Sequence, residues 1–139
     1  MKDAETRKLA KALQRAHAGE TAAYLAYQGH WKSLRNVDPV ASERIREIQD
    51  DEWDHRQAVQ WMLKEVESEP NGVRDFVFTV IGYLASFLCY IVPMKWSAYG
   101  ARVIETIGDV EYKELAELAR DAGYPAMAVE LEFMGKTEK

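Results

Sequence analysis

The sequence predicts an all-α fold: a four-helix bundle with an extra apolar helix or hairpin between its second and third helices. Four stretches repeat apolar residues every three or four positions, which is the spacing of one helix face. The 8 glycines and 4 prolines lie mostly between these stretches, where they end helices. A chain of 139 residues has the size of one domain with a sizeable core, so residues 1–139 are treated as a single domain.

Short helix-breaking segments delimit the first two predicted helices. The first covers about Ala4–Leu34, and the second begins near Val40 or Ser42 and ends before Pro70. The residues that break them are Asn36, Asp38 and Pro39 after the first, and Pro70, Asn71 and Gly72 after the second.

Proline and glycine also place the last two helices of the bundle. The third starts after Pro93 and continues to Asp121, with Gly123 as its C-cap residue. Pro125 then suits the first turn of the fourth helix, because that position needs no backbone N–H.

The segment between Phe76 and Met94 contains no charged residue. Its length reaches the roughly 18–20 residues that span a bilayer. Three interpretations stay open: a buried connecting helix, a hairpin lying on a membrane surface, and a membrane span. A span fits least well, because it would separate Glu105 from Glu20 and Glu52. The same segment offers an apolar surface through which a homodimer could form.

Composition narrows the class of protein. The net charge of −5, with acids and bases interspersed, argues against nucleic-acid binding. Cys89 is the single cysteine, so no internal disulfide can form and a reducing compartment fits best. The N-terminal residues lack an apolar signal core, which predicts a cytoplasmic protein, able to lie peripherally on the inner membrane.

Each bundle helix carries a glutamate on its otherwise apolar stripe. These residues are Glu20, Glu52, Glu105 and Glu138. A buried carboxylate is costly unless it pairs or binds a metal. Carboxylates that meet in one core from different helices have no obvious common counter-ion except a multivalent cation. The stripes therefore predict a metal site inside the bundle.

The second helix adds a histidine to this set. Glu52-Trp53-Asp54-His55 is a Glu-x-x-His sequence, which places a carboxylate and an imidazole on one helical face. This pair of ligands suits iron or manganese. Tyr27 and Tyr112 each follow a glutamate by seven residues and serve either as core aromatics or as hydrogen-bond partners of a metal ligand.

The remaining histidines are weaker candidates. His17 lies one position off the stripe and is expected on the helix surface or in support of a ligand, and His30 is expected to be structural. No nucleophile triad, glycine-rich phosphate loop or cysteine zinc cluster is present in the sequence, so no residue is assigned as an acid, base or nucleophile.

At these residues the chain resembles the demethoxyubiquinone hydroxylase family, a branch of the ferritin-like di-iron proteins. His17-Ala18-Gly19-Glu20, followed by Ala23, Tyr27 and Gly29, resembles the first-helix signature of that family. Glu52-Trp53-Asp54-His55 is similar to its second-helix motif, and the block 103–107, continuing to Tyr112, is similar to its third-helix motif. The likeness covers about residues 16–118, and the uncharged segment falls where the family carries an apolar, membrane-associating hairpin.

The resemblance implies a ferritin-like bundle that binds two iron ions, with manganese as the alternative metal. It implies activation of dioxygen and hydroxylation of a quinone ring or another small apolar substrate, with electrons from a reductase or a reduced nicotinamide. Carried over by position, Glu20, Glu52, His55 and Glu105 would be iron ligands. Tyr112 would be hydrogen-bonded to one of them.

The chain departs from the family pattern at its C-terminal end. The fourth helix of the family supplies a second Glu-x-x-His, and Glu138 is the residue in phase to begin it. The sequence ends at Lys139, before the matching histidine. Either this is a truncated stretch of a longer protein, or the site is incomplete and binds one metal ion. The uncharged segment also differs from that of the family, which leaves the substrate open.

Three functions are compatible with these observations. The first is a di-iron hydroxylase. The second is a rubrerythrin-like peroxidase or a ferroxidase or iron-binding protein, although Cys89 alone cannot form a rubredoxin module. The third is a membrane-associated helical bundle without enzymatic activity.

Overall fold

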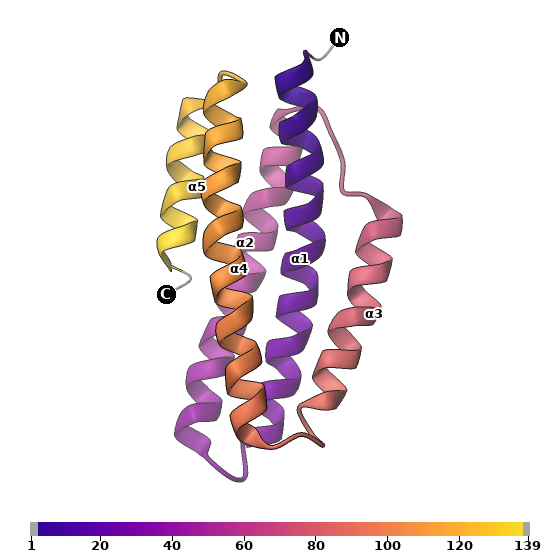
Figure 1. Cartoon of the computed structure of the whole chain (residues 1–139), viewed down its shortest axis with the longest axis vertical. Helices are drawn as coiled ribbons and strands as arrows, with labels where there is room; N and C mark the ends of the chain where they lie inside the picture. Colours follow the sequence, from indigo (N-terminus) through magenta and orange to yellow (C-terminus); the bar gives the residue numbers. More distant parts are fainter. Residues whose placement is uncertain (1–2, 138–139) are drawn as a thin grey trace.

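The computed structural model describes residues 3–137, and this part of the chain contains five helices and no strand. They are α1 (Ala4–Leu34), α2 (Pro39–Glu65), α3 (Gly72–Leu88), α4 (Met94–Asp121) and α5 (Pro125–Thr137). Figure 1 shows that α1, α2, α4 and α5 form an upright bundle, with α3 on its flank. The predicted all-α bundle with an inserted apolar helix is confirmed.

Side-chain caps begin three of the helices. Asp3, Asp38 and Asn71 each accept a hydrogen bond from the backbone N–H three residues later, which satisfies a donor of the first helical turn. The donor–acceptor distances are 2.7 Å from Thr6, 3.1 Å from Ala41 and 3.0 Å from Arg74.

The turn between α4 and α5 follows the sequence-based expectation. Gly123 has a φ of +89°, in the left-handed region that favours glycine, and Pro125 is the first residue of α5. The chain therefore reverses here, and α5 packs back along α4.

The main hydrophobic core lies at the end of the bundle where α5 is present. It contains residues from four helices: Leu9 and Leu13 of α1, Val59 and Met62 of α2, Leu115 and Ala119 of α4, and Met127 and Leu131 of α5, together with their buried neighbours. Because α5 is much shorter than α4, it runs beside only the C-terminal half of that helix (Figure 1). The N-terminal half of α4 therefore contributes no buried residue.

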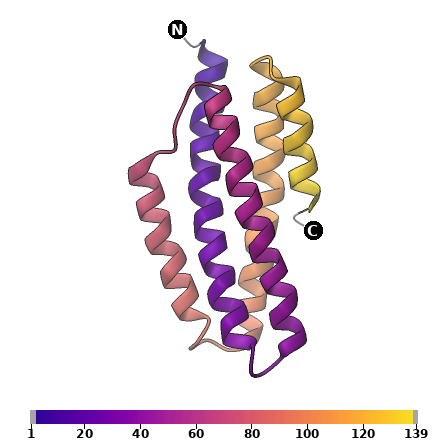
Figure 2. The ribbon, with the colours of Figure 1, turned by 180° about the vertical axis from the view of Figure 1, so that it is seen from behind.

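Helix α3 packs mainly against α1, on the outer flank of the bundle (Figure 2). Two glycines bring the helices close together. A Cβ atom on Gly29 would overlap both Oγ and Cα of Ser86, and a Cβ atom on Gly82 would lie 2.8 Å from Cβ of Leu25. These contacts leave no room for side chains at positions 29 and 82.

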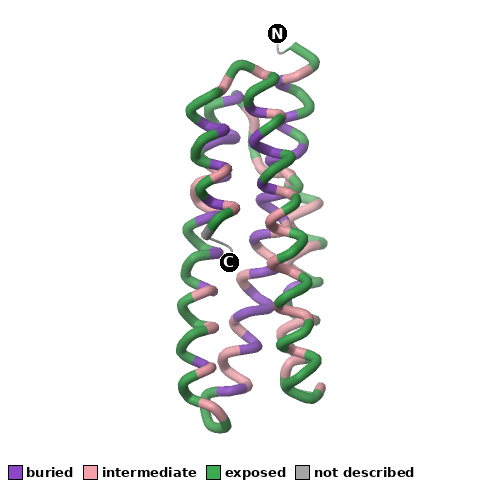
Figure 3. Tube along the Cα trace, turned by 60° about the vertical axis from the view of Figure 1, so that its left-hand side comes forward, coloured by how far each residue is buried: buried purple, intermediate pink, exposed green. Residues whose placement is uncertain are grey.

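The uncharged segment is not buried within this chain, so its interpretation as a buried connecting helix is wrong. Gly82 is the one buried residue of α3, whereas the side chains of Phe76 and Phe87 are 69% and 63% exposed. The burial pattern in Figure 3 shows the same contrast between the bundle interior and its flank. The reason is geometric: α3 carries apolar side chains on all its sides, but only one helix, α1, packs extensively against it. None of the described helices has the length and apolar character needed to cross a membrane.

Candidate metal centre

Glu20 of α1 and the pair Glu52 and His55 of α2 meet inside the bundle. One potential ligand atom from each residue lies within 4.8 Å of those of the other two. The three residues are only 7%, 4% and 7% exposed. Glu52 and His55 are three positions apart, so the helical repeat directs both side chains from α2 toward α1.

The chemistry of these donors fits a divalent transition metal. Two carboxylates supply hard oxygen ligands, and one imidazole supplies a neutral nitrogen ligand, the combination found in carboxylate-bridged iron and manganese sites. Two carboxylates in so small and buried a space would also repel each other, which a bound cation would relieve.

Tyr112 of α4 is directed at this cluster. Its hydroxyl group donates a 2.5 Å hydrogen bond to Oε1 of Glu20, and its ring packs edge-on against His55 with centroids 5.8 Å apart. Both tyrosine and glutamate are buried. The tyrosine therefore restricts the orientation of Glu20, as partners of metal ligands commonly do.

Tyr112→Phe is expected to weaken both the fold and metal binding. The change removes a buried hydrogen bond to a carboxylate, worth about 1.5–3 kcal/mol, while it keeps the ring. Urea unfolding of the metal-free protein measures the first effect, and titration with Mn²⁺ measures the second. Tyr124→Phe, at a half-buried position, is a matched control that should leave Mn²⁺ affinity unchanged.

The other glutamates and the second tyrosine expected at the site have different positions. Glu105 is half-buried on α4 and is not part of the three-residue cluster. Glu138 lies outside the described residues. Tyr27 is buried, and its hydroxyl group donates a 3.4 Å hydrogen bond to the backbone carbonyl of Ala101, which connects α1 to α4.

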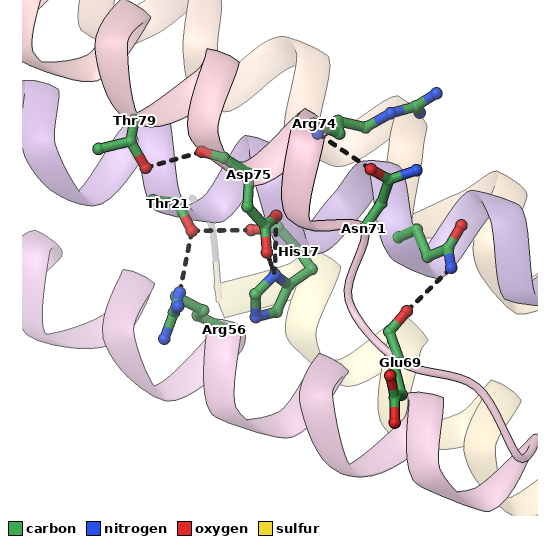
Figure 4. Close-up of polar contacts among 9 residues, drawn as sticks. His17, Thr21, Arg56, Glu69, Asn71, Arg74, Asp75 and Thr79 are labelled. Carbon is green, nitrogen blue, oxygen red and sulfur yellow. Dashed lines mark hydrogen bonds and ion pairs between the residues drawn. The ribbon is translucent and has the colours of Figure 1, made fainter.

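His17 connects α1 to the flanking helix. It is 1% exposed, and its Nδ1 lies 3.0 Å from Oδ2 of Asp75 in the first turn of α3. Its backbone carbonyl accepts a hydrogen bond from Thr21, whose Oγ1 accepts one from Arg56 of α2 (Figure 4). A surface position for His17 is therefore wrong, because α3 covers this flank of α1.

A cavity of about 320 Å³ opens beside the cluster, between α1, α3 and α4. Its walls are mainly alanine, glycine, isoleucine and phenylalanine side chains. Of the described residues that line it, the polar ones are Glu20, Glu52 and Glu111. We call this cavity the carboxylate chamber. Sequence reasoning missed Glu111, because it lies beside the apolar stripe of α4; its spacing from Ile104, Ile107 and Gly108 was the available signal.

A second cavity of about 270 Å³ continues from the chamber toward the turn between α3 and α4, and we call it the apolar arm. The two cavities share Ala26, Ala85 and Ile104. Burial lowers the pKa of His30 and raises the pKa of the Cys89 thiol, so both titratable side chains favour their neutral forms. The arm therefore suits an uncharged, apolar ligand.

The fold and the buried Glu–Glu–His cluster define a ferritin-like helical bundle with a candidate metal site. A family model described as "Ubiquinone biosynthesis protein COQ7" matches residues 7–132, nearly the whole chain. The chain belongs to this family, which confirms the resemblance seen in its sequence motifs. No curated protein and no solved structure gives a significant match.

Proposed function

We propose that this protein is a di-iron, oxygen-activating hydroxylase that acts on a quinone-type ring in ubiquinone biosynthesis. The observation that carries the proposal is the opening of the metal cluster into the chamber: Glu20 and Glu52 belong to both. A substrate in the chamber would thus lie directly beside the metal ligands. Membership of the ubiquinone biosynthesis family supports the same substrate class.

The residues of the chain have separable tasks in this function. Glu20, Glu52 and His55 would hold the metal, and bound iron would supply the activation of dioxygen. Tyr112 fixes the orientation of Glu20. The mainly apolar walls of the chamber would hold the reacting ring beside the metal ligands, and the arm would accommodate an apolar substituent.

The apolar chamber favours hydroxylation over peroxide reduction or iron oxidation. Peroxide and ferrous ion are small and polar and require no apolar space of this size beside the metal ligands. A hydroxylase also needs electrons, for which a separate reductase or a reduced nicotinamide would serve. Glu105, together with a second Glu-x-x-His beginning at Glu138 in a longer chain, would complete the ligand set.

Metal content tests the proposal. Protein produced in iron-replete medium, with residues after Lys139 included where the gene encodes them, is expected to contain about two iron ions per chain and to develop a ferric absorption band in air. Absence of bound metal, even after anaerobic loading with ferrous ion, would refute the hydroxylase function and leave a helical bundle without this chemistry.

We also propose that α3 and the turn after it contact a membrane surface. Exposed apolar and aromatic side chains occur on α3, in the turn after it and in the first turn of α4: Phe76, Tyr83, Leu84, Phe87, Tyr90, Ile91 and Trp96. Aromatic side chains at the rim of an apolar surface are typical of interfacial anchors. A quinone with an apolar tail resides in the membrane, so the position of the arm beside this surface gives the substrate a short path.

Phe87→Asp is expected to reduce binding to phospholipid vesicles by tenfold or more, because it removes about 1.5–3 kcal/mol of apolar transfer free energy and adds a charge. Co-sedimentation with vesicles measures the change. Phe133→Asp on α5 is a matched control, since Phe133 is 66% exposed and Phe87 63%. An equal loss of vesicle binding by the two variants would contradict a specific role of α3 at the membrane. If the protein is instead a dimer that dissociates on Phe87→Asp, the partner of α3 is a second copy of this chain.

A further inference from the structure

Two contacts between α1 and α2 involve residues that adjoin the candidate metal ligands in sequence. Nε of Arg56 donates a 2.9 Å hydrogen bond to Oγ1 of Thr21, and the rings of Trp53 and Tyr24 pack with their centroids 5.3 Å apart. Thr21 is the residue after the α1 ligand, and Trp53 and Arg56 each follow an α2 ligand. The two contacts therefore connect the two ligand-bearing turns.

The hydroxyl group of Thr21 acts as donor and acceptor at once. It has a single proton, which it donates to the backbone carbonyl of His17 at 3.1 Å, and its oxygen accepts the proton of Arg56 (Figure 4). A hydrogen bond from a cation is stronger than one between two neutral groups. The turn of α1 that carries Glu20 is thus joined to α2 by a directional polar contact.

The side chain of Arg56 is also restrained from a second side. Its guanidinium carbon lies 5.1 Å from the centroid of the Trp53 ring, within the roughly 6 Å over which a cation and an aromatic face attract each other. A guanidinium group is planar and rigid, so its stacking on the ring limits the directions in which Nε can donate. The stacking and the hydrogen bond therefore fix the orientation of Arg56 together.

The separation of α1 and α2 decides whether the three candidate ligands can bind one ion. Glu52 and His55 lie on the same helix, so the helical repeat alone keeps their spacing. Glu20 lies on the other helix, and its distance from that pair depends on how α1 and α2 are held together. Binding groups must be held within about 0.5 Å of the productive geometry, which gives an interhelical contact at this level a direct effect on metal binding.

Deepening the proposed function, on whose metal centre the inference rests, we propose that Arg56 is a positioning residue of this centre and acts through the hydroxyl group of Thr21. It holds the turn of Glu20 at the distance from the α2 ligands that a divalent ion requires. The contact between the two side chains raises metal affinity. The positive charge of Arg56 does not, because it repels a cation.

Mn²⁺ titration of Thr21→Val tests this role, with the resonance signal of unbound Mn²⁺ as the readout. Valine has nearly the same shape but neither donates nor accepts, so Mn²⁺ affinity is expected to fall about tenfold or more. Thr21→Ser keeps both hydrogen bonds and should stay within about twofold of the wild type. Thr106→Val is the matched control, since the Thr106 hydroxyl group donates to the carbonyl of Arg102 at 3.0 Å on exposed α4 surface.

The stability of the metal-free proteins separates positioning from folding. Thr21→Val should lower the urea midpoint of the metal-free protein no more than Thr106→Val does. A loss of metal-free stability that accounts for the whole loss of affinity would show that the contact serves the fold alone, and would overturn the inference. Loss of Mn²⁺ affinity in Thr21→Ser would overturn it too.

Arg56→Lys tests the same contact from α2. Lysine keeps the charge but has a methylene group where arginine has Nε, so it should lose about as much Mn²⁺ affinity as Thr21→Val. The double variant should lose no more than either single variant, because both remove one contact. Unchanged affinity in either single variant, or losses that add in the double variant, would overturn the inference.

The outcome is separable from the test of the proposed function. A wild-type protein that binds metal as tightly as its Thr21→Val and Arg56→Lys variants refutes the positioning role alone and leaves the hydroxylase in place. A wild-type protein that binds neither Mn²⁺ nor Fe²⁺ refutes the metal centre, and with it both proposals.

Discussion

Glu52→Ala is expected to abolish the thermal stabilisation that Fe²⁺ or Mn²⁺ gives to the wild-type protein. A ligand that binds only the folded state stabilises it by about 2.7 kcal/mol at 100 times its dissociation constant, and this gain requires an intact site. Glu52 is 4% exposed and belongs to the three-residue cluster, so its loss removes one of two carboxylates. Melting curves with and without metal measure the effect.

The metal-free protein should respond in the opposite direction. Without a cation, Glu20 and Glu52 repel each other, so the removal of one charge should leave the melting temperature unchanged or raise it. Asp51→Ala, at the exposed neighbouring position on α2, is the control and should retain the full stabilisation by metal. A similar loss of stability by Glu52→Ala with and without metal would show that Glu52 has a structural role and is not a ligand.

The helices and part of the site could be predicted because both depend on the helical repeat. Glu52 and His55 share one face of α2 by spacing alone, and the stripe of α1 carries Glu20 in phase with its core residues. Gly123 ends α4 as expected from its backbone freedom, whereas α2 begins at Pro39, slightly before the expected Val40 or Ser42, because proline suits the first helical position. These features are local in sequence, and the structure contains them as expected.

The other features of the fold and the site depend on which helices are neighbours. The apolar repeat of one helix does not contain this information. Position 17 is buried because α3 covers that side of α1 and supplies Asp75. Glu111 faces a cavity only because α3 stands apart from α4 and leaves the chamber between them. The apolar character of α3 likewise left burial, a membrane-surface position and a span open, because its exposure depends on how many helices pack against it.

Gly29→Ala is expected to destabilise the fold and to disturb the chamber, although alanine is the better helix former. A glycine inside a helix costs about 1 kcal/mol relative to alanine, so its presence within α1, five residues before the helix ends at Leu34, needs a compensating contact. That contact is Ser86 of α3: a methyl group at position 29 would overlap Oγ and Cα of the serine. The backbone of α3 would have to move, and overpacking of this kind typically costs about 1–3 kcal/mol.

The displacement has a consequence for function, because α3 forms one wall of both the chamber and the apolar arm. Gly29→Ala should therefore weaken binding of a quinone-type ring with an apolar tail as well as lower the urea midpoint. Gly19→Ala is the matched control on the same helix: nothing lies within 4 Å of a Cβ there, so a gain in stability of up to about 1 kcal/mol is expected. Removal of the hydroxyl group by Ser86→Ala should not rescue Gly29→Ala, since the Cα overlap remains. Equal stability of the two glycine variants would mean that α3 is not held against α1 by this close approach, and that the chamber has no fixed third wall.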